Sequence, residues 1–176
     1  EVGSQISAAG PLTLQAGRDL NATAANVQAE GRLDVSAARD VNILAGQDSQ
    51  TQNDARYGRD SGTFSSSETT SRQTKQATSA QGSSFGGQTV NLQAGRDIQV
   101  QGSSIVSDQG TALSAGNNIT IEAASNTSAE SHFFDTKKSG LMGTGGGGIG
   151  FTVGKKQNST DQQTQNTTAA ASTIGA

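Results

Sequence analysis

Apolar residues recur at alternate positions in four short stretches of the chain, and the four stretches share one form. Two alternating runs flank a four-residue segment made of Ala, Gly, Arg, Asp or Asn. Alternation with a period of two is typical of a β-strand with one buried face, and the residues between the runs favour turns. Each stretch therefore predicts a strand, a bend and a second strand. The stretches are LTLQAGRDLNA from Leu12, LDVSAARDVNI from Leu33, VNLQAGRDIQV from Val90 and TALSAGNNITI from Thr111.

The spacing of the bends predicts how the strands are arranged. Asp19 and Asp40 are 21 residues apart, and so are Asp97 and Asn118. A repeat of this length is too short for the helical repeat families, and Thr-rich, Gly-punctuated segments favour strands. We therefore predict an all-β fold, a right-handed parallel β-helix with about 21 residues per coil.

Stacked coils would place equivalent apolar residues one above another in columns. A core of this kind is narrow, and each large side chain contributes only about 1.5–3 kcal/mol when fully buried. A single coil could not offset its own ordering entropy, so neighbouring coils must stabilise one another. The predicted columns are Leu14, Val35, Leu92 and Leu113, and Leu20, Val41, Ile98 and Ile119.

Two long polar excursions interrupt the coils. The second and third bends lie 57 residues apart, which is 36 more than one coil, and the inserted residues are Thr-rich and alternate as in an exposed hairpin. A second insertion follows the fourth motif, so the larger repeating unit is two coils and one excursion. The predicted segments are coils at 1–46, a first excursion at 47–88, coils at 89–124, a Gly-rich second excursion at 125–170 and a return to the coils at 171–176.

Composition supports a thin, repetitive core. Ser, Thr, Asn and Gln account for 70 of the 176 residues and Gly for 23, whereas Leu, Ile, Val and Phe account for only 29. So few large apolar residues would indicate disorder in a highly charged chain, but the formal net charge is only −3 and the apolar residues are patterned. An ordered β-solenoid fits both observations.

Several function classes are excluded or made improbable by the same counts. The chain has no cysteine and only one histidine, His132, which leaves no thiolate zinc site and no Cys nucleophile. The 12 Lys and Arg residues are dispersed, so no nucleic acid partner is expected. No apolar run approaches the ~20 residues of a membrane-spanning helix. We expect the chain to be a segment of something longer, because it has no initiating Met or signal peptide.

Charged residues at the bends form a regular pattern that could be mistaken for a calcium ladder. Asp and Asn at bends bond their own turn, and the fourth bend replaces both charges with Asn without losing the pattern. We interpret these residues as structural corners, and we expect no metal, no cofactor and no catalytic residue. The corner residues are Arg18, Asp19, Arg39, Asp40, Arg96, Asp97, Asn117 and Asn118.

The second excursion contains an uncharged, Gly-rich stretch, residues 139–154, flanked by lysines. Its G-x-G-x-x-G spacing lacks the strand–helix setting of a dinucleotide site, so we predict a hairpin that turns at Gly145–Gly148. We favour packing of this tip against the coils or another copy; contact with an anionic lipid surface or a partner, to which an apolar tip with basic legs is suited, is the alternative. The candidate contact residues are Leu141, Met142, Ile149, Phe151, Val153, Lys137, Lys138, Lys155 and Lys156.

The repeated coils, such as LTLQAGRDLNA and VNLQAGRDIQV, and the Gly-rich arm GLMGTGGGGIGFTVG resemble the haemagglutinin repeats of filamentous-haemagglutinin-like exoproteins of Gram-negative bacteria. That group includes large adhesins and contact-dependent growth inhibition effectors, secreted by the two-partner route. The resemblance implies a rod-like β-helix on the cell surface and export through a dedicated outer-membrane transporter. It also implies action on contact with another cell, and it supplies no catalytic residues.

Two classes of function follow as expectations. The favoured one is a non-enzymatic, outer-membrane-associated surface module, either an adhesive rod or a segment that engages the target-cell envelope (lipid, protein or glycan) during toxin delivery. The alternative is a β-helical polysaccharide-degrading enzyme, which would need clustered acids and aromatic platforms; this chain has one Tyr and no Trp. The sequence leaves self-association open.

Overall fold

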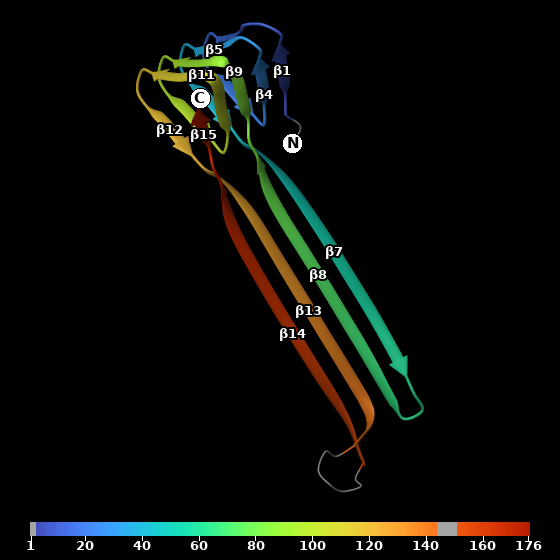
Figure 1. The fold of residues 1–176 in the computed structure, drawn as a ribbon. Helices are drawn as coiled ribbons and strands as arrows, with labels where there is room; N and C mark the ends of the chain where they lie inside the picture. Colours follow the sequence, from blue (N-terminus) through green and yellow to red (C-terminus); the bar gives the residue numbers. More distant parts are fainter. Residues whose placement is uncertain (1–2, 144–150) are drawn as a thin grey trace. The chain divides into compact units, whose positions relative to one another are not determined.

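The regular structure of the protein consists only of strands in the computed structural model, which describes residues 3–143 and 151–176 (Figure 1). The chain divides into two compact units. We call the first the coil unit; it comprises Glu1–Ser49, Thr78–Thr127 and Thr167–Ala176. The second, the arm unit, comprises Gln50–Ala77 and Ser128–Asn166.

Short strands build the coil unit, and every strand pair in it is parallel. One sheet has the order β1-β4-β9-β11-β15, with β5 also paired to β9 and β2 to β5; the other has the order β12-β10-β6-β3. The strands are β1 (Gln5–Ala8), β2 (Leu12–Ala16), β3 (Leu20–Thr23), β4 (Asn26–Ala29), β5 (Arg32–Ala37), β6 (Val41–Leu44), β9 (Ser84–Ala94), β10 (Ile98–Gln101), β11 (Ser104–Ala115), β12 (Ile119–Glu122) and β15 (Thr173–Gly175).

Both predicted columns are confirmed by the strand register. In the first column, Leu14 pairs with Val35, and the register continues through Leu92 to Leu113. In the second, the register runs from Leu20 through Val41 and Ile98 to Ile119. The middle members are buried, whereas Ile119 in the outermost coil is 44% exposed. Each coil therefore does cover the apolar residues of its neighbour.

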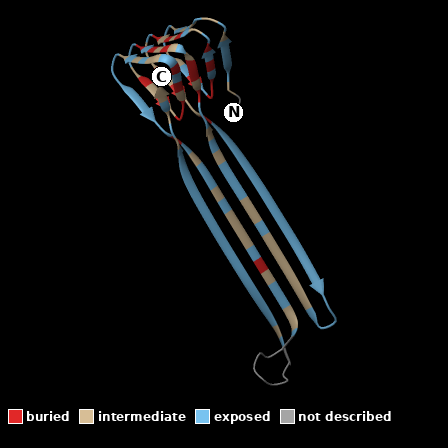
Figure 2. Cartoon of the chain, viewed as in Figure 1, coloured by how far each residue is buried: buried red, intermediate tan, exposed pale blue. Residues whose placement is uncertain are grey.

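A third column completes the core and was not predicted. It passes through the register pairs of Ile6 with Val27, Phe85 and Ile105, and ends at Ile174. Val27, Phe85 and Ile105 are at most 2% exposed. Buried side chains are confined almost entirely to the coil unit in Figure 2. The core is thus a narrow stack with three sides of apolar residues, as a 21-residue coil of three short strands requires.

Four long strands form the arm unit, where they lie side by side in one sheet (Figure 1). The sheet order is β14-β13-β8-β7, so each arm is a two-stranded hairpin and the arms meet at β8 and β13. β9 begins within the range predicted for the first excursion. The strands are β7 (Gly46–Ser61), β8 (Ser65–Gln81), β13 (Ala124–Gly143) and β14 (Phe151–Ala170).

The arms replace short corners in alternate coils. After β3 and after β10, only Ala24-Ala25 and Gly102-Ser103 join one strand to the next. After β6 and after β12, an entire arm takes their place in the sequence. Ala24 and Gly102 both have left-handed backbone, with φ of 50° and 56°. Each short corner therefore turns the chain with one residue of left-handed backbone. Where an arm follows instead, the arm strands make the connection to the next coil strand.

Candidate functional site

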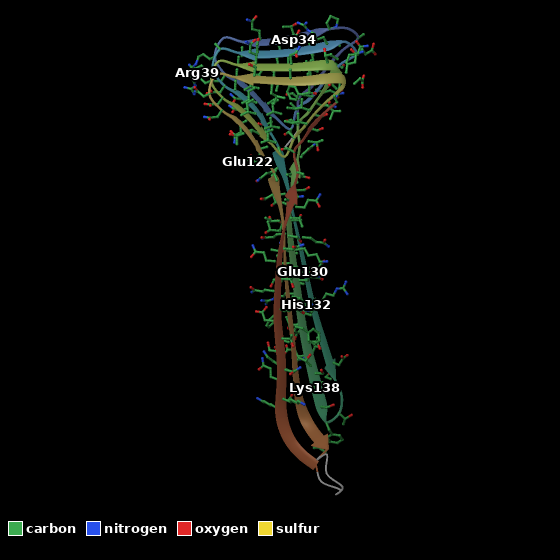
Figure 3. The ribbon with its side chains drawn as sticks, turned by 60° about the vertical axis from the view of Figure 1, so that its left-hand side comes forward. Asp34, Arg39, Glu122, Glu130, His132 and Lys138 are labelled. Carbon is green, nitrogen blue, oxygen red and sulfur yellow. The ribbon has the colours of Figure 1, made fainter. Side chains whose placement is uncertain are left out.

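The predicted corner residues form a ladder of contacts between successive coils. The Arg39 guanidinium donates to both carboxylate oxygens of Asp19, at 2.9 and 2.6 Å. Arg96 does the same to Asp40, at 3.1 and 2.6 Å. Each arginine thus pairs with the aspartate of the preceding coil, which is a bidentate geometry that favours the ionised carboxylate. Figure 3 labels Arg39 at this corner.

The ladder determines the ionisation of its carboxylates. The hydrogen bonds from Arg39 and Arg96 hold the pKa values of Asp19 and Asp40 below their ordinary value, against a smaller opposing effect of desolvation. At the fourth corner, the backbone N–H and the side-chain amide of Asn118 donate to Asp97 at 3.1 and 3.2 Å. Asp19 and Asp40, whose pKa values are lowered by their arginine partners, are poor general acids. The corners join coils and do not resemble a catalytic cluster.

Serine side chains close the coil at the base of each arm. Ser83, the second residue after β8, donates its hydroxyl proton to the carbonyl of Leu44 at 2.7 Å and accepts from the backbone N–H of Ala25 at 3.0 Å. Ser172 donates to the carbonyl of Glu122 at 2.6 Å. Leu44 and Glu122 are the last residues of the strands that precede the arms. We call these two contacts the serine clasps.

The arm sheet has almost no core of its own. Among the residues that the structure describes in the arm unit, only Asp135 is buried, with 7% of its surface exposed. Its carboxylate accepts from Gln157 at 2.9 Å and lies 3.7 Å from the Lys137 ammonium. Figure 3 shows side chains on the arm strands, with Glu130, His132 and Lys138 following one another along them. A sheet built this way depends on its backbone hydrogen bonds and on polar side-chain pairs.

Polar pairs join the two arms where β8 meets β13. The backbone N–H of Leu141 donates to the carbonyl of Phe64 at 3.0 Å, and Ser66 bonds Ser139 at 2.7 Å. Farther along, Glu130 accepts from Gln73 at 2.6 Å. The residue numbers run in opposite directions, as in an antiparallel pair. The Gln73 hydrogen bond is the main cause that lowers the pKa of Glu130, and Lys75 lowers it further.

Four of the five lysines converge on one part of the arm unit. Lys137 and Lys138 lie on β13, and Lys155 and Lys156 lie on its neighbour β14. Lys138 and Lys156 line a surface pocket of about 670 Å³ together with Leu141. All four lysines and Arg59 line a second pocket of about 370 Å³. The lysines therefore contribute positive charge to the walls of both pockets.

Acidic groups balance this basic cluster only in part. Lys137 is paired with Asp135. Within residues 3–143 and 151–176, Lys138, Lys155 and Lys156 are in no ion pair. Glu68, which also lines the smaller pocket, accepts a hydrogen bond from the Tyr57 hydroxyl, and this contact raises the pKa of Tyr57 above its ordinary value. The cluster therefore presents excess positive charge to solvent.

The predicted contact residues are only partly within the described structure. Leu141 is 45% exposed and Val153 is 77% exposed, and both are at the same end of the arm strands as the lysines. Ile149 and the proposed turn at Gly145–Gly148 lie outside the described residues, as do the side chains of Met142 and Phe151. Contact by these residues stays a prediction.

Sequence reasoning missed the serine clasps, the buried Asp135 and the joint between the arms. A signal for the clasps exists in the sequence: a Ser followed by Ser or Thr occurs at 83–84, 103–104 and 172–173, where β9, β11 and β15 begin. No comparable signal marks the joint, because its side chains are as polar as the rest of the arms.

Neither a metal-binding cluster nor a membrane-spanning helix is found in residues 3–143 and 151–176. Throughout the described part of the chain, no group of three or more His, Cys, Asp or Glu side chains is placed to hold a metal ion. The same residues include no helix long and apolar enough to cross a membrane.

Comparison with known proteins identifies relatives of the chain. The sequence profile of a family described as "Hemagglutinin repeat" matches residues 1–66 and 61–176. Over 175 residues the chain is 41% identical to the 16S rRNA endonuclease CdiA of Enterobacter cloacae subsp. cloacae, an alignment that covers 98% of the chain and 5% of that protein. The chain thus spans only a small fraction of this relative's length. No solved structure gives a significant match.

Proposed function

We propose, because the chain belongs to the hemagglutinin repeat family, that it is a non-enzymatic repeat module of a large secreted exoprotein. On this proposal the parent protein leaves the cell through an outer-membrane transporter of the two-partner type and acts at the surface, on contact with another cell. The relative's name describes an RNA endonuclease, and we assign no such activity to these repeats.

The coils serve in this proposal as a right-handed parallel β-helix that spaces the arms. Support comes from the parallel register of the coil unit and from its 21-residue repeat, exemplified by Leu20 with Val41. Parallel strands joined in one direction around a core favour the right-handed crossover. The rival function, polysaccharide cleavage, gains no support, because the corner carboxylates are paired with arginine or asparagine.

The arm unit is the part that we propose to contact the target-cell envelope. The observation that carries the proposal is the basic cluster of Lys137, Lys138, Lys155 and Lys156, which is incompletely neutralised and lies near the exposed Leu141 and Val153. Lysines beside an anionic lipid surface contribute about 1 kcal/mol each. Exposed apolar side chains among them would add contact with the acyl region.

Vesicle binding tests the proposal. The chain should bind vesicles that contain phosphatidylglycerol and should not bind vesicles of phosphatidylcholine alone. Replacing the four clustered lysines with Gln should weaken binding by about a hundredfold, because Lys138, Lys155 and Lys156, which are in no ion pair within the described residues, contribute about 1 kcal/mol each. Lys75→Gln is the matched control, because Lys75 lies 3.5 Å from Glu130 in an ion pair, so its charge is already compensated.

Two results would contradict envelope contact through the cluster. One is equal binding of the quadruple variant and the wild-type chain to the anionic vesicles. The other is an equal loss of binding in Lys75→Gln, which would indicate a dispersed charge effect.

A further inference from the structure

The outer strands of the arm sheet have the features of strands that accept a partner. β7 and β14 each have a neighbour on one side only in the described sheet. Every side chain of β7 from Gln47 to Ser61 is exposed, and β14 is exposed almost throughout residues 153–169. Proteins usually protect such edges with Pro, with charged side chains, especially Lys, or with short strands. Both edge strands are long and have no proline; β7 has five charged residues, all Asp or Arg, and the charged residues of β14 are Lys155, Lys156 and Asp161.

The joint between the arms shows what an edge of this kind pairs with. The second strand of the first arm, β8, pairs with the first strand of the second arm, β13. β14 is again the second strand of an arm, and β7 is again a first strand. The two free edges are therefore counterparts of the two edges already joined inside the molecule. From this we infer that β14 of one chain pairs with β7 of a second copy, and repeats the β8–β13 joint.

Equivalent positions fix the register of the inferred pair. The clasp serines Ser83 and Ser172 are 89 residues apart, and the carbonyls that they bond, those of Leu44 and Glu122, are 78 residues apart. Each β8 residue thus corresponds to the β14 residue 89 positions later, and each β13 residue to the β7 residue 78 positions earlier. Since Ser66 faces Ser139 in the internal joint, Lys155 should face Ser61 of the second copy.

Side chains in this register are complementary. Lys156 comes opposite Asp60 of the second copy, and Thr160 comes opposite Arg56. Nearer the base of the arms, Thr, Gln and Asn side chains of residues 162–167 meet polar residues 49–54. Facing residues of opposite charge and facing hydroxyl or amide groups stabilise a strand pair, and no like charges are directly opposed.

Backbone donors are available on the free edge of β7. The N–H of Leu141 points toward β8, so the odd-numbered residues of β13 donate into the joint. The corresponding residues of β7 are also odd-numbered, and Ala55 is one of them. Gly62, which is even-numbered, donates inward to Ser65 at 2.7 Å, as this alternation requires. The Ala55 N–H is therefore unused in the sheet and available to the second copy.

Because the two edges differ, the pairing does not close on itself. A β14-to-β7 contact is heterologous, and each added copy presents a new free β14 or β7. The inferred product is a growing array with one continuous sheet of arms, and its size increases with protein concentration. This inference does not rest on membrane contact, although Lys155 and Lys156 belong to both the inferred strand pair and the lysine cluster.

Disulfide trapping tests both the pairing and its register. The chain contains no cysteine, so single-cysteine variants report only on the introduced positions. A mixture of Thr160→Cys and Arg56→Cys chains should form a mixed disulfide, because the two positions face each other as a closely spaced antiparallel pair. The control mixture, Thr160→Cys with Gln50→Cys, is offset by six residues and should cross-link at least about tenfold less, since disulfides need Cα atoms within about 7 Å.

A backbone variant tests the pairing without any cross-link. Ala55→Pro removes only an outward donor, which an edge strand tolerates, and should raise the concentration needed for association about tenfold. Ala55→Ser keeps the N–H and should associate like the wild-type chain. Sedimentation velocity measures association, and circular dichroism checks that each variant is folded. Equal cross-linking in the two mixtures, a wild-type chain that stays monomeric, or unchanged association of folded Ala55→Pro would each overturn the inference.

Discussion

Two described residues with left-handed backbone, Ala24 and Gly102, mark the short corners of the coil unit, and a third residue with positive φ, Gly140, lies in β13. Gly102 has a φ of 56°, and a Cβ placed on it would overlap the Cβ of Ala124 and lie 3.1 Å from that of Ala45. Ala24 adopts nearly the same φ at the equivalent corner. The corner at Ala24 therefore accommodates a Cβ atom, whereas the corner at Gly102 has no room for one.

Replacing Gly102 with Ala should destabilise the coil unit by at least about 2 kcal/mol, because strain of left-handed backbone adds to overlap with Ala124. Chemical unfolding followed by circular dichroism measures the loss. Gly110→Ala is the control; its Cβ would meet nothing within 4 Å, so its stability should stay within about 0.5 kcal/mol of wild type. Equal effects of the two substitutions would show that the corner imposes no special constraint.

Removing a clasp hydroxyl should also be costly. Ser83 is 1% exposed and serves both the Leu44 carbonyl and the Ala25 N–H. In Ser83→Ala the buried N–H of Ala25 loses its partner, and the Leu44 carbonyl keeps only the N–H of Ala24 at 3.2 Å, which together cost about 1–3 kcal/mol. Ser114→Ala, at an exposed position of β11, is the comparison and should change the unfolding free energy by less than about 0.5 kcal/mol. A Ser83→Ala chain as stable as Ser114→Ala would exclude the clasp as a stabilising contact.

At the scale of elements, charge pairing links one coil to the next. Arg39 and Arg96 lower the pKa values of Asp19 and Asp40 in the folded chain. A carboxylate with a lowered folded pKa stabilises the fold above its unfolded pKa, near 3.8, and this stabilisation disappears as the pH falls through the folded value. The ladder therefore acts at neutral pH and weakens in acid.

Replacing both arginines with Gln should lower the thermal midpoint at pH 7 and change it much less at pH 2. The difference between wild type and variant should begin to narrow as the pH falls below about 3.8, the ordinary pKa of Asp. Calorimetric scans at several pH values measure this difference. If the difference in thermal midpoint between wild type and variant is the same at pH 2 and pH 7, the arginines stabilise the coils by packing alone.

A strand could be predicted from the sequence only where burial of one face gives alternating apolar and polar residues. Leu20, Val41 and Ile98 alternate with polar residues, so the coil strands and their register could be read from the sequence. Neither face of the arm sheet is buried, so its strands carry no alternation that specifies a partner. The third column was missed because its apolar residues lack alternating apolar neighbours: Phe85 is followed by two glycines, and Val27 stands between polar residues.

The whole molecule combines two modes of stabilisation. The coil unit has an apolar core, and Phe85, Leu33 and Ile43 are among its largest fully buried side chains. The arm unit relies on backbone ladders and polar pairs, such as Ser66 with Ser139. Removing an arm should therefore leave the coil core intact, provided that the corner can close.

The short corners indicate how to remove the first arm. Ala45 and Ser83 are equivalent to Ala24 and Ala25, so deleting residues 46–82 and joining Ala45 to Ser83 reproduces a two-residue corner. Ala45→Gly in the same chain would supply the left-handed backbone seen at Gly102. The thermal midpoint of this chain should stay within about 5 °C of the wild-type coil transition, a difference of roughly 1–2 kcal/mol. The matched control joins Ala37 to Val41 instead, which removes a corner of the Arg–Asp ladder and should abolish cooperative unfolding. Loss of cooperativity in the arm deletion itself would show that the arm, and not the stacked coils, holds this part of the chain together.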